Sequence, residues 1–384
     1  MKFTVKQKLQ VLHLHSSFNA GGKEVRCVQL INAFGFDVAH TIVSAMPDAY
    51  GAARRIMPGI EWNKGSTFPS LQGRPTPSRL AELARAMAGY DLVLTYNFGA
   101  MDAVLAHTLF GQALNLPPLV HHEDGFNQDE AAKLKATRNW YRRIALGRAS
   151  ALVVPSQRLE QIAVSAWHQP PARVHRVANG IKTAAYLTSP RPDALPRVIK
   201  REGEFWIGTL AGLRAVKNLP RLVRSLCYVT DERWHLVIVG EGPERQAILD
   251  EALRLDIAHR VHLPGAVTDP AKAVGLFDIF ALSSDSEQFP ISVVEAMAAG
   301  LPVVSPDVGD VSAMVAPDNA PFITPAGNEV ELGEALDALA KDPELRARIG
   351  EANRARAQAD YDEAAMVARY RAMYAAAMGR ASFP

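Results

Sequence analysis

Residues 278–305 have the sequence DIFALSSDSEQFPISVVEAMAAGLPVVS, in which two apolar segments of strand length flank a helical segment. The first apolar segment is 278–284 and the second is 302–305, and both are rich in the residues of buried strands. Proline fits best at the first position of a helix, so we expect the helix to begin at Pro290. The stretch therefore predicts one strand–helix–strand unit of a parallel sheet.

The same alternation recurs on both sides of this stretch. It pauses once, at 183–204, where three prolines interrupt any clean period. Strand-like segments lie at 9–15, 38–44, 91–96, 117–126 and 151–154 before the pause, and at 205–212, 235–240, 261–265, 278–284, 302–305 and 321–324 after it. The alternation predicts an α/β protein with two doubly wound domains.

A length of 384 residues agrees with two domains of ordinary size. We expect the following division: a first domain over 1–185, a linker over 186–204, a second domain over 205–362, and a terminal helix, 363–384, that crosses back to the first domain. The Pro/Gly-rich stretch 57–79 shows little pattern and is expected to be a long surface loop, with a substrate-facing role as the alternative.

Composition excludes several classes of protein. The chain is 48% hydrophobic and 21% charged, as in soluble globular proteins, and no apolar run approaches the roughly 18 residues that span a bilayer. Cys27 and Cys227 are the only cysteines, so neither a disulfide framework nor a thiolate metal site is indicated. The amino terminus is too polar for a signal peptide, and we expect a cytoplasmic protein.

Charge is distributed unevenly between the halves. Residues 1–190 contain 21 Lys and Arg against 12 Asp and Glu, whereas the remainder contains 21 against 28. The first half is therefore expected to face an anionic partner, for which a phospholipid surface, a phosphorylated acceptor and nucleic acid are the candidates.

The helix that begins near Pro290 carries groups suited to a diphosphate. The backbone N–H groups of Ile291 and Ser292 have no partner within the helix, and the helix dipole adds partial positive charge. Glu295 could accept hydrogen bonds from ribose hydroxyls, and Glu287 lies in the preceding loop. Spacing alone leaves a simpler explanation open, in which both glutamates are solvated side chains near a helix start.

The string EQFPISVVEAMAAGLPVV, 287–304, resembles the E-x7-E signature of retaining glycosyltransferases of the GT-B fold, family 4. The resemblance implies two Rossmann-like domains facing across a cleft. It also implies that Glu295 binds ribose, that Glu287 binds the donor sugar, and that the backbone at Gln288 and Phe289 faces that sugar. Gln288 departs from the usual glycine.

A second block, IGTLAGLRAVKNLPRLVRSL at 207–226, is similar to the strand, basic loop and helix of the same family. The resemblance makes Arg214 and Lys217 the cations that neutralise a departing nucleoside diphosphate, with no metal and no other cofactor. Gly21 and Gly22 resemble the glycine loop that opens the first domain, although a plain strand-to-helix turn explains them as well.

Polar residues end the strand-like segment 117–126. Relatives carry a histidine or an acidic group here, so we expect His122 to be a catalytic cleft residue, with His121, Glu123 and Asp124 on the acceptor side. A metal is disfavoured, because neighbouring strand residues point to opposite faces. A purely structural strand end is the alternative.

Segment 133–148, KLKATRNWYRRIALGR, combines six cations with aromatic and aliphatic residues. This pattern is typical of an amphipathic helix at an anionic membrane surface, and a solvated basic face is the alternative. Nucleic acid is not expected, since no recognition motif accompanies the charge.

The resemblance implies transfer of a hexose-type sugar from a UDP- or GDP-sugar to a glycan or lipid-linked acceptor. The setting it implies is cell-envelope polysaccharide or glycolipid synthesis, on the inner face of the cytoplasmic membrane. The alternatives are a non-catalytic nucleotide-sugar-binding subunit, and an epimerase or sugar phosphorylase of the same fold.

Overall fold

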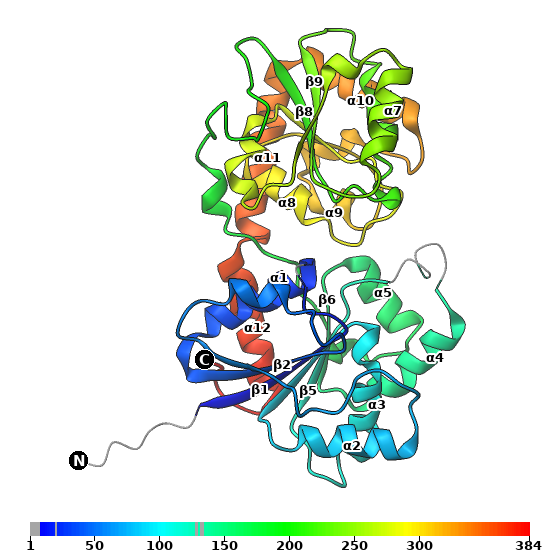
Figure 1. Cartoon of the computed structure of the whole chain (residues 1–384), viewed down its shortest axis with the longest axis vertical. Coiled ribbons are helices and arrows are strands. Elements are labelled where there is room, and N and C mark those ends of the chain that lie inside the picture. Colours follow the sequence, from blue (N-terminus) through cyan, green and yellow to red (C-terminus); the bar gives the residue numbers. More distant parts are fainter. Residues whose placement is uncertain (1–7, 20, 127–129, 131–133) are drawn as a thin grey trace, which may run out of the picture. The chain divides into compact units, whose positions relative to one another are not determined.

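The computed structural model describes residues 8–19, 21–126, 130 and 134–384. The chain forms two compact units, shown in Figure 1. Unit 1 comprises Met1–Ala178 and Met366–Pro384, and unit 2 comprises Asn179–Ala365. The end of the chain therefore belongs to the same unit as its beginning.

Residues 186–204, the expected linker, belong instead to unit 2. Tyr186 and Leu195 are buried there, and Lys200 Nζ pairs with Asp278 Oδ2 at 2.7 Å. The expectation of a separate linker is wrong because a few apolar and charged side chains suffice to fasten a segment that has no periodic pattern.

Unit 1 is built on a seven-stranded parallel sheet of order β3-β2-β1-β4-β5-β6-β7. Its strands are β1 Leu9–His15, β2 Val38–Ser44, β3 Glu61–Lys64, β4 Leu92–Tyr96, β5 Leu119–His122, β6 Ala151–Val154 and β7 Val174–Arg176. The order reverses direction between β1 and β4, which is the topological switch point of a doubly wound fold.

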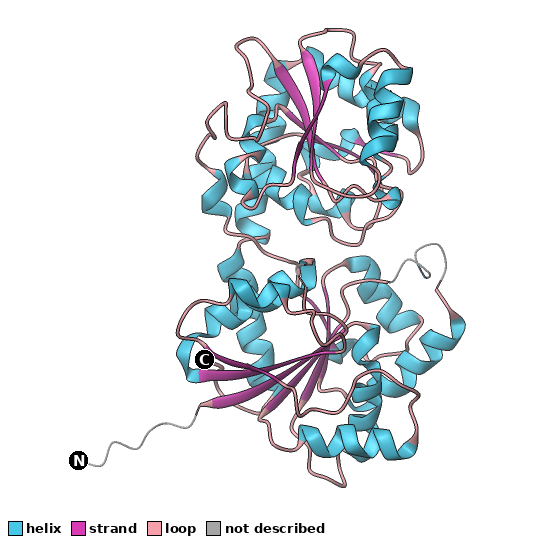
Figure 2. Cartoon of the chain, in the orientation of Figure 1, coloured by secondary structure: helices cyan, strands magenta, loops and turns pink. Residues whose placement is uncertain are grey.

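Alternate residues of these strands enter two cores. Val11, Leu94 and Tyr96 pack beneath helices α1 and α12, whereas Leu12 and Val93 pack beneath α2, α3 and α5. The helices of unit 1 are α1 Gly22–Phe34, α2 Pro77–Met87, α3 Met101–Phe110, α4 Ala136–Ala145, α5 Gln157–Ser165 and, from Met366 on, α12 Glu363–Ala377. Figure 2 shows helices on both faces of the sheet.

Strand β3 was not expected, because it lies inside the Pro/Gly-rich stretch 57–79. Its four residues, EWNK, are mostly exposed at the edge of the sheet, so they lack the apolar pattern of a buried strand. Strand β7, at the other edge, has only three residues and was missed for the same reason.

Unit 2 is built on a six-stranded parallel sheet of order β10-β9-β8-β11-β12-β13, in which the direction reverses between β8 and β11. The strands are β8 Phe205–Leu210, β9 Trp234–Val239, β10 Val261–Gly265, β11 Ile279–Ala281, β12 Val303–Pro306 and β13 Ile323–Thr324. The helices are α6 Leu219–Leu226, α7 Arg245–Arg254, α8 Ile291–Ala298, α9 Val311–Met314, α10 Glu329–Lys341 and α11 Pro343–Asp360.

Each expected strand of both units is present within a few residues of its predicted bounds. The chain thus has two parallel-sheet α/β domains, as its alternating pattern predicts. Among the described residues, no helix combines the length and the apolar character that crossing a bilayer requires.

Candidate functional site

The candidate site of unit 2 lies where two adjacent strands end. Strand β8 pairs with β11, and the chain leaves these strands through the loops 211–218 and 282–290. Both loops emerge at the carboxyl edge of the sheet, on either side of its switch point. Ligands of open α/β sheets bind in the crevice at this position.

Hydrogen bonds and an ion pair fasten the loop 282–290 to the loop 211–218 and to the helix α6 that follows it. The Asp285 N–H donates to the Val216 carbonyl at 2.9 Å, and Ser283 Oγ donates to the Lys217 carbonyl at 3.0 Å. Arg221 bridges the same loop, through the Ser283 carbonyl at 3.1 Å and Asp285 Oδ1 at 2.7 Å. The loop that carries Lys217 is therefore held in a fixed position against the loop that carries Glu287.

Glu287 and Lys217 form an ion pair within this site. The Lys217 ammonium donates to Glu287 Oε1, and Ser284 Oγ donates to the same oxygen at 2.8 Å. Both charged side chains are largely shielded from solvent. The structure brings together two residues that the sequence assigned to the diphosphate and to the donor sugar, and it shows that they also contact each other.

Helix α8 begins at Ile291, one residue later than expected, with Pro290 as its N-cap. Val293 N–H donates back to the Pro290 carbonyl at 3.0 Å. The N–H groups of Ile291 and Ser292 precede the first intrahelical hydrogen bond and so stay available for a ligand. A diphosphate site at this helix start is consistent with the geometry.

Glu295 lies one turn into α8, and its surroundings differ from the expected exposed position. Glu295 Oε1 accepts a hydrogen bond from the Tyr186 hydroxyl at 3.0 Å. Burial raises the pKa of Glu295 to about 7, and the charge of Asp269 acts in the same direction. The carboxylate is thus held by a residue from the segment η7 Thr183–Tyr186 and is costly to ionise.

Arg214 is exposed in the middle of the loop 211–218. Glycines shape the backbone beneath it: a Cβ at Gly240 would lie 1.8 Å from the Ala211 carbonyl oxygen, and one at Gly242 would lie 2.4 Å from that of Leu213. Both glycines also have φ near 157°. The turn 240–243 therefore supports the Arg214 loop at a distance that only glycine permits.

Gln288 and Phe289 are held by different means. The backbone carbonyl of Gln288 accepts from the Asp310 N–H at 3.2 Å, and its buried Oε1 has no hydrogen-bond partner among the described residues. The Phe289 ring packs edge-on against Tyr361, with 5.7 Å between centroids. The departure from glycine at position 288 therefore places an unsatisfied amide oxygen beside Glu287.

In unit 1, Gly21 is the N-cap of α1 and has an extended backbone. A Cβ at Gly21 would lie 2.7 Å from Glu24 Oε2, so the glycine makes room for a buried carboxylate that pairs with Lys23. Gly22 is the first residue of the helix. Both glycines lie at the carboxyl end of β1, next to the switch point of the first sheet.

The acceptor-side residues are mostly paired within the protein. His121 Nδ1 lies 2.8 Å from Thr95 Oγ1, and Glu123 Oε2 accepts from Arg142 Nε at 3.1 Å. Asp124 receives both terminal nitrogens of the Arg26 guanidinium, one of them at 2.9 Å. His121 and Glu123 are completely buried, so this set is a structural strand end rather than an open acceptor surface.

His122 does not fit the catalytic cleft role expected for it. Its ring is completely buried, with Nε2 at 2.8 Å from the Tyr374 hydroxyl and Nδ1 at 3.1 Å from the Thr95 carbonyl oxygen. Burial lowers the pKa of His122 well below its ordinary value. Neither nitrogen is available to a substrate, because the terminal helix α12 covers this face of the sheet.

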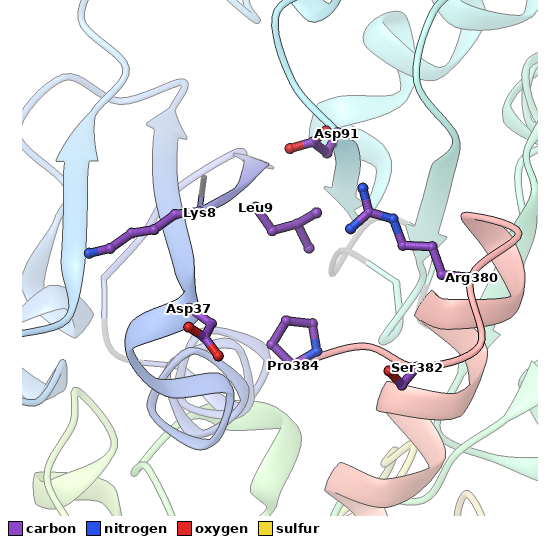
Figure 3. A pocket seen from close by; sticks show the side chains of 7 residues that line it. All are labelled: Lys8, Leu9, Asp37, Asp91, Arg380, Ser382 and Pro384. Carbon is purple, nitrogen blue, oxygen red and sulfur yellow. The ribbon is translucent and has the colours of Figure 1, made fainter. Parts of the chain in front are cut away.

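Unit 1 also contains a polar cavity, shown in Figure 3, at the opposite edge of its sheet. Leu9 begins β1 and Asp91 directly precedes β4, so the cavity lies at the amino ends of these strands. The residues that line it are Lys8, Leu9, Asp37, Asp91, Arg380, Ser382 and Pro384. None of them belongs to the site predicted from the sequence.

Comparison with known proteins finds one family model that matches most of unit 1 and another that matches most of unit 2. The model described as "Glycosyltransferase Family 4" matches residues 20–185, and the model described as "Glycosyl transferases group 1" matches residues 191–356. A GDP-mannose-dependent alpha-mannosyltransferase of Mycolicibacterium smegmatis is 32% identical over 305 residues, which are 76% of this chain and 77% of the relative. This chain belongs to the family 4 glycosyltransferases.

Other matches agree with this assignment. The glycosyltransferase is 27% identical over 174 residues to N-acetyl-alpha-D-glucosaminyl L-malate synthase of Bacillus anthracis, an alignment that spans 45% of this chain and 46% of that enzyme. A crystal structure of Anabaena HepE in complex with UDP superposes with a TM-score of 0.76 at 20% identity, covering 94% of this chain and 98% of the other. That likeness identifies the fold as GT-B.

Two residues of the glycosyltransferase site escaped the sequence reasoning. Tyr186 holds Glu295, and Ser284 holds Glu287. Ser284 lies three residues before Glu287 and could have been considered as a local partner. Tyr186 lies 109 residues before Glu295, and the sequence contains no signal for that contact.

Proposed function

We propose that the glycosyltransferase moves a hexose-type sugar from a UDP- or GDP-sugar to a glycan or lipid-linked acceptor, with retention of anomeric configuration. The observation that carries this proposal is the grouping of Lys217, Glu287 and Glu295 at the carboxyl edge of the second sheet, beside the start of α8. The implied setting is cell-envelope polysaccharide or glycolipid synthesis.

In this proposal the diphosphate of the donor lies at the start of α8. The N–H groups of Ile291 and Ser292 bind it, and Lys217 and Arg214 neutralise the charge that develops as the sugar–phosphate bond breaks. The arriving diphosphate competes with Glu287 for the Lys217 ammonium, which frees Glu287 to accept hydrogen bonds from the donor sugar. These two cations supply the charge that a metal ion supplies in other transferases.

The bond from the anomeric carbon to the diphosphate breaks as the acceptor hydroxyl attacks that carbon. The attack comes from the face of the sugar ring that the diphosphate leaves. The acceptor's proton passes to the departing phosphate oxygen, so the products are the glycoside and the nucleoside diphosphate. Glu295 binds the ribose hydroxyls in this scheme. Neither Glu287 nor Glu295 acts as the base.

A donor panel tests the proposal. GDP-mannose, UDP-glucose, UDP-N-acetylglucosamine and ADP-glucose are compared by thermal shift and by nucleotide release with lipid-extract acceptors, and NMR reports the anomeric configuration of the product. We expect one donor to stabilise the protein and to give a product of unchanged configuration. Inversion, or conversion of the donor without any acceptor, contradicts the proposal.

We further propose that α4 contacts an anionic membrane surface. Trp140 and Ile144 are 59% and 56% exposed, and they lie one turn apart on the same face as the exposed Arg143. Exposed apolar side chains flanked by cations are typical of helices that lie in a membrane interface. Of the expected segment 133–148, Lys133 falls outside the described residues, and Arg142 is buried against Glu130 rather than exposed.

Sedimentation with vesicles tests the membrane contact. Wild-type protein is expected to co-sediment with vesicles containing phosphatidylglycerol and to remain in solution with purely zwitterionic vesicles, with weaker binding at high salt. The double variant Trp140→Ser, Ile144→Ser should lose this binding. Leu253→Ser, at an equally exposed leucine of unit 2, is the matched control and should bind as wild type does.

A further inference from the structure

Three buried side chains of unit 1 bring metal-binding atoms together. His13 and His15 lie two residues apart on β1, so both point to the same face of the sheet. Cys27 comes from α1, which covers that face. The ligand atoms of the three side chains all lie within 4.8 Å of one another, and none of the three residues is more than 1% exposed.

His15 is the first indication that the cluster has a ligand. Its two ring nitrogens are buried, and neither has a hydrogen-bond partner among the described residues. The ring stacks on Tyr96 at 3.9 Å between centroids, which fixes its plane but satisfies no polar atom. Buried polar atoms are nearly always paired, since an unpaired one has lost its hydrogen bonds to water without replacement.

His13 is oriented so that one nitrogen can bind an ion. Its Nε2 lies 2.9 Å from His40 Nδ1, and its Nδ1 lies 3.4 Å from Cys27 Sγ. In the tautomer in which Nε2 donates to His40, Nδ1 carries a lone pair that faces both the Cys27 thiol and the Tyr96 hydroxyl, which lies 3.3 Å away. An ion at this nitrogen takes the place of the Tyr96 hydroxyl. Metal-binding histidines are usually oriented in this way, by a hydrogen bond from the other ring nitrogen.

Two cations lie near the cluster, and each is paired with a carboxylate. The nearby guanidinium of Arg26 is paired with Asp124, and the ammonium of Lys23 is paired with Glu24, so each positive charge is locally balanced. An ion that displaces the Cys27 thiol proton is paired with the thiolate that it creates.

We propose that His13, His15 and Cys27 form a zinc site in unit 1. Two imidazole nitrogens and a thiolate are ligands that Zn²⁺ prefers. Binding forms one Zn–S and two Zn–N bonds and breaks the S–H bond of Cys27, whose proton is released to solvent. The ion ties strand β1 to helix α1 directly before the Gly21–Gly22 turn. The inference is independent of the proposed donor and acceptor.

The two cysteines of the chain provide a matched test. Wild type, Cys27→Ala and Cys227→Ala are produced in zinc-supplemented and in cobalt-supplemented medium, because the buried ligands must be loaded during folding. Metal content is measured by mass spectrometry and thiolate–cobalt charge transfer by near-ultraviolet absorption. Cys227, on the surface of unit 2, serves as the control thiol.

We expect one zinc ion per chain in wild type and in Cys227→Ala, a charge-transfer band in the cobalt forms of both, and neither feature in Cys27→Ala. Wild type without metal, or a band that survives in Cys27→Ala, overturns the site. Loss of the band in Cys227→Ala does so as well.

A measurement on wild type alone covers the case in which Cys27→Ala fails to fold. X-ray absorption at the zinc edge should then show one sulfur and two imidazole nitrogens around the metal. A shell without sulfur, or one with two sulfurs, overturns the proposal.

Discussion

The two sheets share one topology but differ in where they place their polar side chains. In unit 2, Lys217 and Glu287 stand in loops beyond the strand ends, in contact with each other and partly open to solvent. In unit 1, His13, His15 and His122 stand within the strands and are covered by α1 and α12. The same topology therefore holds polar side chains in loops beyond the strands in one unit and encloses them within the strands in the other.

The largest expected effect concerns Lys217. Lys217→Ala should lower kcat by about 100-fold or more, because a cation aimed at the developing phosphate charge contributes most in the transition state. Nucleotide release measures the rate, and circular dichroism checks the fold. Lys341→Ala removes a lysine paired with Asp337 on the surface of α10 and should leave kcat unchanged. Turnover above a tenth of wild type in Lys217→Ala would contradict the assignment.

The second prediction concerns the cost of ionising Glu295. The pKa of Glu295 is about 7 in the folded protein, against an ordinary value of 4.5. Between these pH values the folded state holds a proton that the unfolded state loses. The free energy of unfolding therefore falls as pH rises from 4.5 through 7. Glu295→Gln should therefore raise the free energy of unfolding at pH 8 by about 2 kcal/mol, and by less at pH 5. Urea titration at both values measures the difference.

The exposed Glu334 of α10 is the control for this measurement. Glu334→Gln should show no such dependence on pH. An equal gain at pH 5 and pH 8 in Glu295→Gln would show that ionisation is not the cause.

The third prediction concerns the buried hydrogen bond between Tyr374 and His122 in unit 1. Tyr374→Phe removes the hydroxyl bonded to His122 and should lower the free energy of unfolding by about 1–2 kcal/mol, with kcat unchanged. Tyr370→Phe is its control, since the buried Tyr370 hydroxyl has no hydrogen-bond partner among the described residues. That variant should be as stable as wild type. A large loss of kcat in Tyr374→Phe would restore His122 to a catalytic role.

The smallest effect is expected at Tyr186, whose hydroxyl donates a hydrogen bond to Glu295. Tyr186→Phe should raise the donor KM about threefold and leave kcat intact, because a neutral hydrogen bond contributes about 1 kcal/mol. The Tyr186 hydroxyl lowers the pKa of Glu295, so its removal should move the acid limb of the kcat/KM profile to higher pH. An unchanged profile would show that Tyr186 does not act through Glu295.

Sequence reasoning predicted what is local. The strands within apolar runs, the α8 helix start and the basic loop follow from patterns a few residues long. The polar edge strand β3 has no such pattern, and its pairing with β2 depends on residues about 20 positions away. The missed strands β3 and β7 differ from the located strands in that most of their side chains are not buried.

The sequence predicted several residues of the candidate site, but it did not predict which of them contact each other. The resemblance singled out Lys217 and Glu287, but their ion pair spans 70 residues of chain. His122 was misjudged because its partner, Tyr374, lies 252 residues later on the terminal helix, and the sequence does not indicate which strand residue that helix covers. Burial of a polar group depends on the elements that cover it, and these come from distant parts of the chain.

The return of Met366–Pro384 to unit 1 constrains the order of events during synthesis. Tyr370, Tyr374 and Phe383 belong to the core that faces α1, so this core is incomplete until these residues have left the ribosome. Unit 2 lies wholly before Met366 and has no such requirement. Of the two units, the one whose translation begins first is therefore the one completed last, and the nascent chain must shield its open face until Met366–Pro384 has been made.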